Sequence, residues 1–183
     1  YLCARLPRDG AYFVRVSDAQ EHGDESHAYR LRLGPRRPDF AVFATPSSLN
    51  VPGGGVVPLR AHVVRADGFD GDVEIALAGD AAGFTLSGSR VPRGRDSVAM
   101  TLTVPPARTG RLVDLHLEAR ARIGGQEVVR RVQPADDMMQ AFAYQHLVPA
   151  QQLLVGIGPS QMRSPALDLG GPGPLRVPAG GTA

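Results

Sequence analysis

The sequence predicts an all-β protein: an antiparallel β-sandwich, preceded by part of a second β-sandwich at the N-terminus. The 22 glycines and 16 prolines fall between apolar runs, which is typical of many short strands joined by turns. Residues 56–123 show no apolar period of 3.6 residues. On both sides of residues 65–72, apolar and polar residues alternate instead, as in strands that bury one face. The alternating apolar residues are Val57, Leu59, Ala61, Val63, Val73, Ile75 and Leu77.

Residues 65–72 predict the tight connection between these two strands. Asp67-Gly68 and Asp70-Gly71 offer the positive φ angles and the local side-chain hydrogen bonds that a turn needs. Phe69 lies between the two Asp-Gly pairs and is expected to fold down onto the end of a core. The segment is therefore interpreted as a β-hairpin or as a corner between two sheets.

Residues 1–34 predict the C-terminal part of a first sandwich. Pro7-Arg-Asp-Gly10 has the composition of a turn, and residues 17–26 that of an exposed loop. Residues 35–38 contain two prolines and predict a stiff linker. The expected strands are 1–6, 11–16 and 27–33.

Residues 39–158 predict a complete two-sheet sandwich, because the number of strands and the frequency of turns suit that architecture. Residues 159–183 are expected to be a linker and the start of a further repeat. Within the sandwich, Pro46 should stop the first strand, and residues 49–55 should form a short edge element and a glycine turn. The other expected strands are 57–63, 73–77, 84–86, 97–104, 112–123, 127–132 and 153–157.

Residues 136–146 are ambiguous. Met138, Met139, Phe142 and His146 suit one face of a helical turn after two aspartates, whereas Met138, Phe142, Tyr144 and His146 suit one face of a strand. We expect a short helical turn or an irregular crossover, with the methionines and aromatic residues in the core.

One short sequence occurs twice. Leu49-Asn-Val-Pro-Gly-Gly-Gly55 recurs as Leu175-Arg-Val-Pro-Ala-Gly-Gly181, an offset of 126 residues. Because this offset is a plausible domain length, it predicts tandem sandwiches rather than a chance match. The chain also begins with Tyr1 rather than with Met, so we expect it to be a piece of a longer polypeptide.

Two stretches resemble known families. Asp9-Gly10-x-Tyr12-x-Val14-x-Val16, a polar loop and Tyr29-x-Leu31-x-Leu33 resemble the second half of a bacterial pre-peptidase C-terminal domain. Such domains are small β-sandwiches appended to secreted enzymes and surface proteins, so the resemblance implies that the first strands lie outside this stretch.

The second resemblance spans residues 38–158. Pro38-Asp-Phe40, Val51-Pro-Gly-Gly54 and Asp67-Gly-Phe-Asp-Gly-Asp-Val-Glu-Ile75 resemble immunoglobulin-like repeats of very large bacterial extracellular proteins. This resemblance implies an immunoglobulin-like sandwich in a secreted or cell-surface setting. It implies no catalytic role.

Composition argues against several partners. All 20 basic residues are arginine, they are spread along the chain, and 18 acidic residues leave a net charge of only +2, which does not favour nucleic acid. Cys3 is the single cysteine, so it has no partner for an internal disulfide or a structural zinc site. The sequence has no signal peptide, bilayer-crossing run or lipidation motif, so no membrane insertion is expected.

Asp67, Asp70 and Asp72 are the candidate metal ligands. Calcium needs several converging oxygens, and these carboxylates surround two glycines. The EF-hand order fails, because Ile75 stands where its glycine belongs and Ala81 where its late glutamate belongs. The alternative is a turn held by its own aspartates. A second acidic loop, residues 18–25, has poor ligands at intermediate positions and is interpreted as a solvated tip.

No catalytic motif is present. None of the histidines at 22, 27, 62, 116 and 146 has the i, i+4 partner of a metalloprotease helix. Ser87-Gly-Ser89 is not a Gly-x-Ser-x-Gly nucleophile elbow. The sequence therefore predicts a protein that is not an enzyme and has no cofactor other than a candidate calcium ion.

Three functions remain open. The first is a structural or adhesion-type spacer whose partners are neighbouring β-sandwich domains of the same chain. The second is a module that binds polysaccharide or a surface protein, although the absence of Trp leaves few aromatic platforms. The third is an accessory domain of a secreted peptidase or another exported enzyme.

Overall fold

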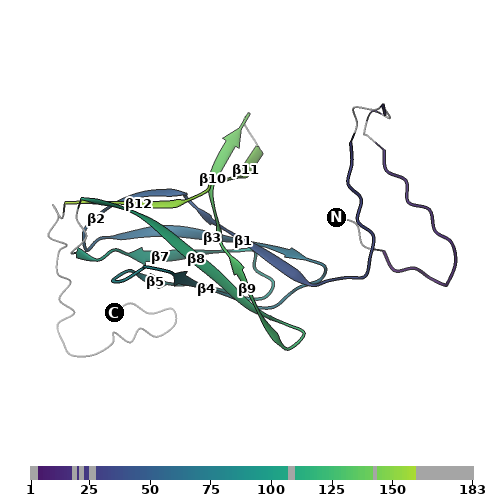
Figure 1. Ribbon diagram of the computed structural model, residues 1–183, viewed down its shortest axis with the longest axis horizontal. Coiled ribbons are helices and arrows are strands. Elements are labelled where there is room, and N and C mark those ends of the chain that lie inside the picture. The colour runs from purple at the N-terminus through teal and green to yellow at the C-terminus, as the bar shows by residue number, and fades with distance from the viewer. Residues whose placement is uncertain are drawn as a thin grey trace, which may run out of the picture.

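The computed structural model describes residues 4–17, 20, 23–24, 28–106, 110–141 and 144–159. From Asp39 to Gly158 they form an all-β structure of two sheets packed as a sandwich, so the predicted all-β sandwich class is confirmed (Figure 1). No described residue lies in a helix that is long and apolar enough to span a membrane. The strands are β1 (Asp39–Thr45), β2 (Ser48–Pro52), β3 (Val56–Ala66), β4 (Val73–Ala78), β5 (Thr85–Ser87), β6 (Arg90–Val91), β7 (Ser97–Thr103), β8 (Arg111–Ile123), β9 (Gln126–Arg131), β10 (Gln133–Gln140), β11 (Tyr144–Pro149) and β12 (Leu153–Gly158).

The two sheets are mixed. One has the order β11-β10-β1-β3-β7-β5, and the other has the order β2-β12-β8-β4-β6, with β9 paired to β8. Most neighbours are antiparallel, as predicted, but β1 pairs with β10 and β2 pairs with β12 in parallel. These parallel pairs arise because the chain changes sheet between β1 and β2 and again between β9 and β10.

The predicted alternation places the core between the sheets. On β8, Leu115, Leu117, Ala119 and Ala121 are buried, while the residues between them are exposed or partly exposed. Phe69 is also buried, as predicted, and its ring lies 5.2 Å from that of Phe40. The turn therefore closes one end of the core.

The glycine turn after β2 depends on two particular glycines. Gly54 has a φ of +77°, a conformation that side-chain-bearing residues rarely adopt. A Cβ on Gly55 would lie 2.8 Å from the carbonyl oxygen of Pro52, closer than packing allows. The N–H of Gly53 donates to the carbonyl of Gly158, so this turn sits beside the end of β12.

The chain enters the sandwich at one end and leaves it at the other (Figure 1). Asp39 pairs with Ala66 at the C-terminal end of β3, whereas Gly158 lies beside the turn that leads into Val56 at the other end of β3. An 11-residue strand separates the two points. At about 3.3 Å per residue, its length is roughly 35 Å.

The closing strand of the second sheet is interrupted. Arg131 pairs with Glu118, the N–H of Val132 donates to the carbonyl of Leu117, and Leu153 pairs with Leu115. An uninterrupted strand would need one residue between Val132 and Leu153, opposite His116. The chain has residues 133–152 there instead, and they form the β10–β11 hairpin. We call these residues the insertion.

The insertion corrects the interpretation of residues 136–146. They belong to a hairpin rather than a helical turn, because β10 leaves the sheet after Ala135 and pairs with β11 from Ala135–Pro149 to Gln140–Tyr144. Met138, Met139 and Tyr144 are 51%, 66% and 77% exposed, so their predicted place in the core is wrong. Phe142 lies outside the described residues.

The N-terminal region differs from its expected strands. Residues 4–17 and 28–34 contain no strand and are exposed, and the Phe13 side chain is 98% exposed. The alternation at 11–16 and 28–33 would bury one face against a second sheet, and the described residues place no sheet there. The assignment of residues 1–34 to a first sandwich therefore stays a prediction. Cys3 and the second copy of the repeat at 175–181 lie outside the described residues.

Truncation of Leu59 to alanine should be costly. Leu59 is 2% exposed between the sheets, so its removal leaves a cavity and should lower the free energy of unfolding by about 2–5 kcal/mol. Leu112→Ala is the matched control, because Leu112 is 68% exposed and should cost within about 0.5 kcal/mol. Urea denaturation followed by circular dichroism measures both values. Equal losses for the two variants would contradict this placement of the core.

Candidate functional site

The three candidate calcium ligands lie on one turn but have different partners. Asp67, at a φ of 54°, accepts a hydrogen bond from the backbone N–H of Arg37 at 2.8 Å. The carboxylate of Asp70 accepts from the Arg93 guanidinium at 3.1 Å and from the Gly94 N–H at 3.0 Å.

Asp72 points to the same neighbouring loop. Its carboxylate accepts from the backbone N–H of Arg93 at 2.8 Å and from the Arg90 guanidinium. Together with Asp70, it fastens the 65–72 turn to residues 90–94. The sequence showed the acidic residues, but their arginine partners are about twenty residues further along and could not be paired with them by local reasoning.

These contacts stabilise the charged carboxylates without a metal ion. Hydrogen bonds from Arg93 and Gly94 lower the pKa of Asp70, and hydrogen bonds from Arg90 and Arg93 lower that of Asp72. Among the described residues, no three Asp, Glu, His or Cys side chains lie close enough together to hold a metal ion. A calcium ion on this turn would have to displace two guanidinium groups.

Beneath the turn, Arg65 joins the loops around Phe69. Its guanidinium lies 5.3 Å from the centre of the Phe69 ring and donates to the carbonyl of Gly71 at 2.6 Å. It also donates to the carbonyls of Pro92 and Arg95, each at 3.1 Å. The contacts of this region are those of a structural corner.

The described histidines are dispersed. His62 is partly buried, its Nε2 lies 3.2 Å from the Thr45 hydroxyl, and burial lowers its pKa against the opposing effect of Asp137. His116 lies on β8 beside Arg131, and His146 is exposed on β11. His22 and His27 lie outside the described residues.

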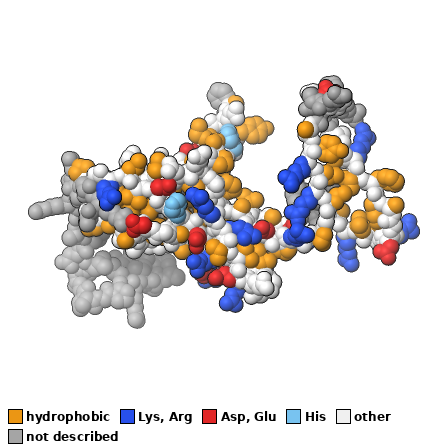
Figure 2. Space-filling model, viewed as in Figure 1, with side chains coloured by type: hydrophobic (Ala, Val, Ile, Leu, Met, Phe, Trp, Pro, Cys, Tyr) orange, Lys and Arg blue, Asp and Glu red, His pale blue; other side chains and the backbone are white. Residues whose placement is uncertain are grey.

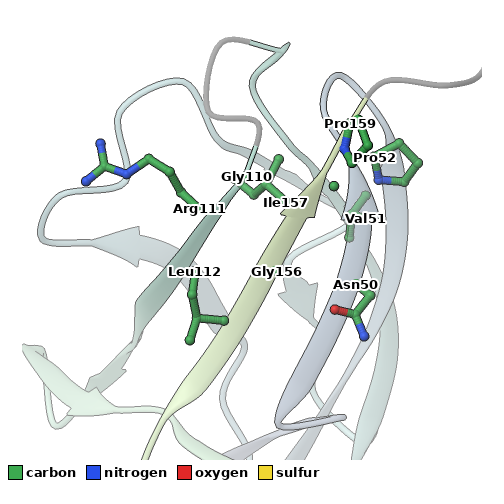
Figure 3. Close-up of a pocket in the computed structure, with 10 residues that line it drawn as sticks. Asn50, Val51, Pro52, Gly110, Arg111, Leu112, Gly156, Ile157 and Pro159 are labelled. Atoms are coloured by element: carbon green, nitrogen blue, oxygen red, sulfur yellow. The ribbon is translucent and has the colours of Figure 1, made fainter.

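A shallow groove of about 520 Å³ runs along the outer face of β12 (Figure 3). It exists because Gly156 and Gly158 have no side chains, whereas Asn50 on β2 and Leu112 on β8 stand on either side. The Asn50 amide partly fills it, because a Cβ on Gly156 would meet its Oδ1 at 2.7 Å. Arg111 is the one ionisable residue in its described lining, so the groove offers no acid–base pair.

The most distinctive surface was missed by sequence reasoning. The insertion projects from the sandwich, and its exposed residues include apolar ones (Figures 1 and 2). The sequence does contain one sign of this surface: residues 132–159 include none of the 20 arginines of the chain. That absence marks a surface that differs in chemistry from the rest.

No protein-family model matches the chain, and no curated protein is significantly similar to it.

Calcium should leave the thermal stability unchanged. Asp70 and Asp72 already accept hydrogen bonds from arginine and backbone N–H groups, so millimolar calcium should not raise the melting temperature. A melt followed by differential scanning fluorimetry, with and without the ion and then with a chelator, measures this. An upward shift that the chelator reverses would contradict the expectation.

Stability should fall in acid because several carboxylates have lowered pKa values. Burial alone would raise the pKa of Asp39, but hydrogen bonds from Arg130 and the Phe40 N–H outweigh it and lower the pKa, as at Asp70 and Asp72. A lowered folded-state pKa adds stability that is present above the ordinary value of 3.8 and is lost as the pH falls through the folded-state value.

Urea titrations between neutral pH and about pH 3 measure this dependence. The triple variant Asp39→Asn, Asp70→Asn, Asp72→Asn should be less stable at neutral pH and should lose less stability in acid. An acid dependence as steep as that of the unmodified chain would contradict the assignment.

Proposed function

We propose that the chain is a non-catalytic structural and adhesion-type β-sandwich module of a large secreted or cell-surface protein. The observation that carries this proposal is the position of the two chain connections. The chain enters at Asp39 and leaves at Gly158, at opposite ends of the long axis of the sandwich (Figure 1). Modules with this geometry can be joined end to end without doubling back.

The pairing of the last strand suits a chain under tension. β12 pairs in parallel with β2 over five residues, from Leu154–Ser48 to Gly158–Pro52. Tension on the two connections pulls β12 away from Asp39 and pulls β2 toward it. The hydrogen bonds between the two strands are then sheared together rather than opened one by one.

The second copy of the repeat supports neighbouring sandwich domains in the same chain. It keeps glycine at the positions of Gly54, which has a positive φ, and Gly55, which has no room for a Cβ. It differs at Asn50, which is exposed, and at Gly53, whose φ is not positive. The repeat therefore keeps the two glycines that the turn requires.

The alternative is a carbohydrate- or protein-binding module attached to a secreted peptidase or another exported enzyme. The exposed apolar side chains of the insertion favour it over a bare spacer. Nucleic acid and membrane insertion are not part of either proposal, and neither proposal requires a bound metal.

Forced unfolding tests the proposed role in tension. With handles at the two ends of the chain, Val51→Pro on β2 should lower the unfolding force more than Leu86→Pro on β5. Both residues lie on edge strands and pack against the core, but only β2 bears the shear against β12. The N–H of Val51 faces β12, two residues before the Gly53 N–H that donates to Gly158, so proline removes a hydrogen bond of that pair. Thermal melts correct for any difference in overall stability. Equal losses of force at equal melting temperatures would contradict the proposal.

A further inference from the structure

We propose that the insertion is a self-association surface, in which the outer edge of β11 pairs with β11 of a second copy of the chain. The two hairpins would then form one four-stranded antiparallel sheet. This inference does not depend on the proposed role in tension, because it rests on the insertion alone.

The sandwich closes without the insertion. Val132 and Leu153 both lie beside β8, opposite Leu117 and Leu115, and are buried at 2% and 1% exposure. A continuous strand would need only one residue between them. The closing strand therefore does not need the twenty residues of the insertion. Pro134 and Ala135 at their base are buried, whereas the described residues from 137 to 146 are exposed.

The base of the insertion is fixed to the sandwich. The Asp136 carboxylate accepts from both the backbone N–H and the hydroxyl of Ser47, each at 2.9 Å. The N–H of Ala150 donates to the carbonyl of Pro134 at 2.8 Å, and the Gln133 amide donates to the carbonyl of Ala150. The hairpin is thus held in one direction, which lowers the entropy lost when it binds a partner.

The outer edge of β11 is open. Among the described strands, β11 is the edge strand of its sheet and pairs only with β10. One side of its backbone therefore has no neighbouring strand. An exposed edge of this kind can pair with another strand unless charge, proline or short length prevents it.

Other edges of the molecule carry such protection. β5 and β6 have three and two residues, β2 contacts β3, and β9 carries Glu127, Arg130 and Arg131. β11 reads Tyr-Gln-His-Leu-Val-Pro, with no acidic or arginine side chain and with proline only at its last position.

The hairpin also presents apolar side chains that a second copy would cover. Register places Met138 opposite His146 and Gln140 opposite Tyr144, so these four share a face with Val148. Met138, Tyr144 and Val148 are 51%, 77% and 41% exposed. A lone two-stranded hairpin is marginally stable in water, so a four-stranded sheet would stabilise it.

An edge without acidic or arginine side chains suits a second copy of itself better than a strongly charged partner. Because β11 carries no acidic or arginine residue, its antiparallel pairing with itself brings no such like charges together. The two acidic residues of the insertion, Asp136 and Asp137, lie on β10 near its base. Pairing around a two-fold axis uses the same edge in both copies, so it closes at a dimer.

Analytical ultracentrifugation of the full chain over a concentration series tests the proposal. We expect a reversible monomer–dimer equilibrium. Val148→Lys should weaken the dimer by roughly tenfold or more, because a hydrated lysine on an edge strand opposes pairing with a second strand. Val129→Lys on β9 is the matched control, because Val129 is also 41% exposed, and it should leave the equilibrium unchanged.

A third variant separates this surface from the exposed N-terminal region. Phe13→Lys removes the most exposed aromatic side chain there and should leave the dimer intact. A chain that stays monomeric up to millimolar concentration would overturn the proposal. So would an association that Phe13→Lys abolishes and Val148→Lys does not.

Replacement of residues 133–152 by one glycine gives a second readout. The variant should fold with the far-ultraviolet circular dichroism of a β-sandwich and remain monomeric at every concentration. A folded variant that still dimerises would overturn the proposal. Should it fail to fold, single cysteines at each of residues 144–148, in a Cys3→Ser background, provide the replacement. The residues at or next to the two-fold axis should form disulfide-linked dimers on mild oxidation. Absence of such dimers for all five variants would count against the edge pairing.

Discussion

The hydrogen-bond ladder along β8 is the feature on which the rest of this structure depends. The 13 residues of β8 pair with β4 on one side, and with β9 followed by β12 on the other. The same strand supplies four buried side chains, Leu115, Leu117, Ala119 and Ala121, to the middle of the core. β8 therefore holds the second sheet together and sets where the chain leaves the sandwich.

An uninterrupted β8 allows its partner strand to be divided. Two segments that are distant in sequence, β9 and β12, complete the ladder, so the chain can leave and return between them at little cost to the core. The chain passes from β9 to β10 close to the point where it passes from β1 to β2. The hydrogen bonds between Ser47 and Asp136 connect these two crossings between the sheets. The residues that stabilise the second sheet, on β8, β9 and β12, are therefore different from the exposed residues of the insertion.

The sequence predicted the parts of the fold that depend on local pattern. Alternation at 57–63, 73–77 and 112–121 gave the right strands and the right inward faces, and two Asp-Gly pairs around Phe69 gave the corner. The insertion could not be predicted in this way. Its exposed methionines and tyrosine look like core residues, and only the register against β8 shows that the closing strand is complete without them.

The candidate sites show the same limit. The acidic turn was visible in the sequence, but the pairing of Asp70 and Asp72 with residues 90–94 arises from tertiary structure. The groove along β12 depends on two glycines whose neighbours come from β2 and β8, which sequence spacing does not bring together. The alternation at 11–16 and 28–33 predicted strands, yet those residues form none, and their apolar side chains are exposed.

Hydrogen exchange at a concentration low enough to keep the chain monomeric is the most direct test that the insertion is separate from the fold. Amides of β8, β9 and β12 should exchange slowly and together, since they open only when the sandwich unfolds. Amides of residues 136–148 should exchange much faster, through local opening of the hairpin. Equal protection of the insertion and β8 would show that the hairpin belongs to the cooperative core, and would contradict the division of the closing strand described here.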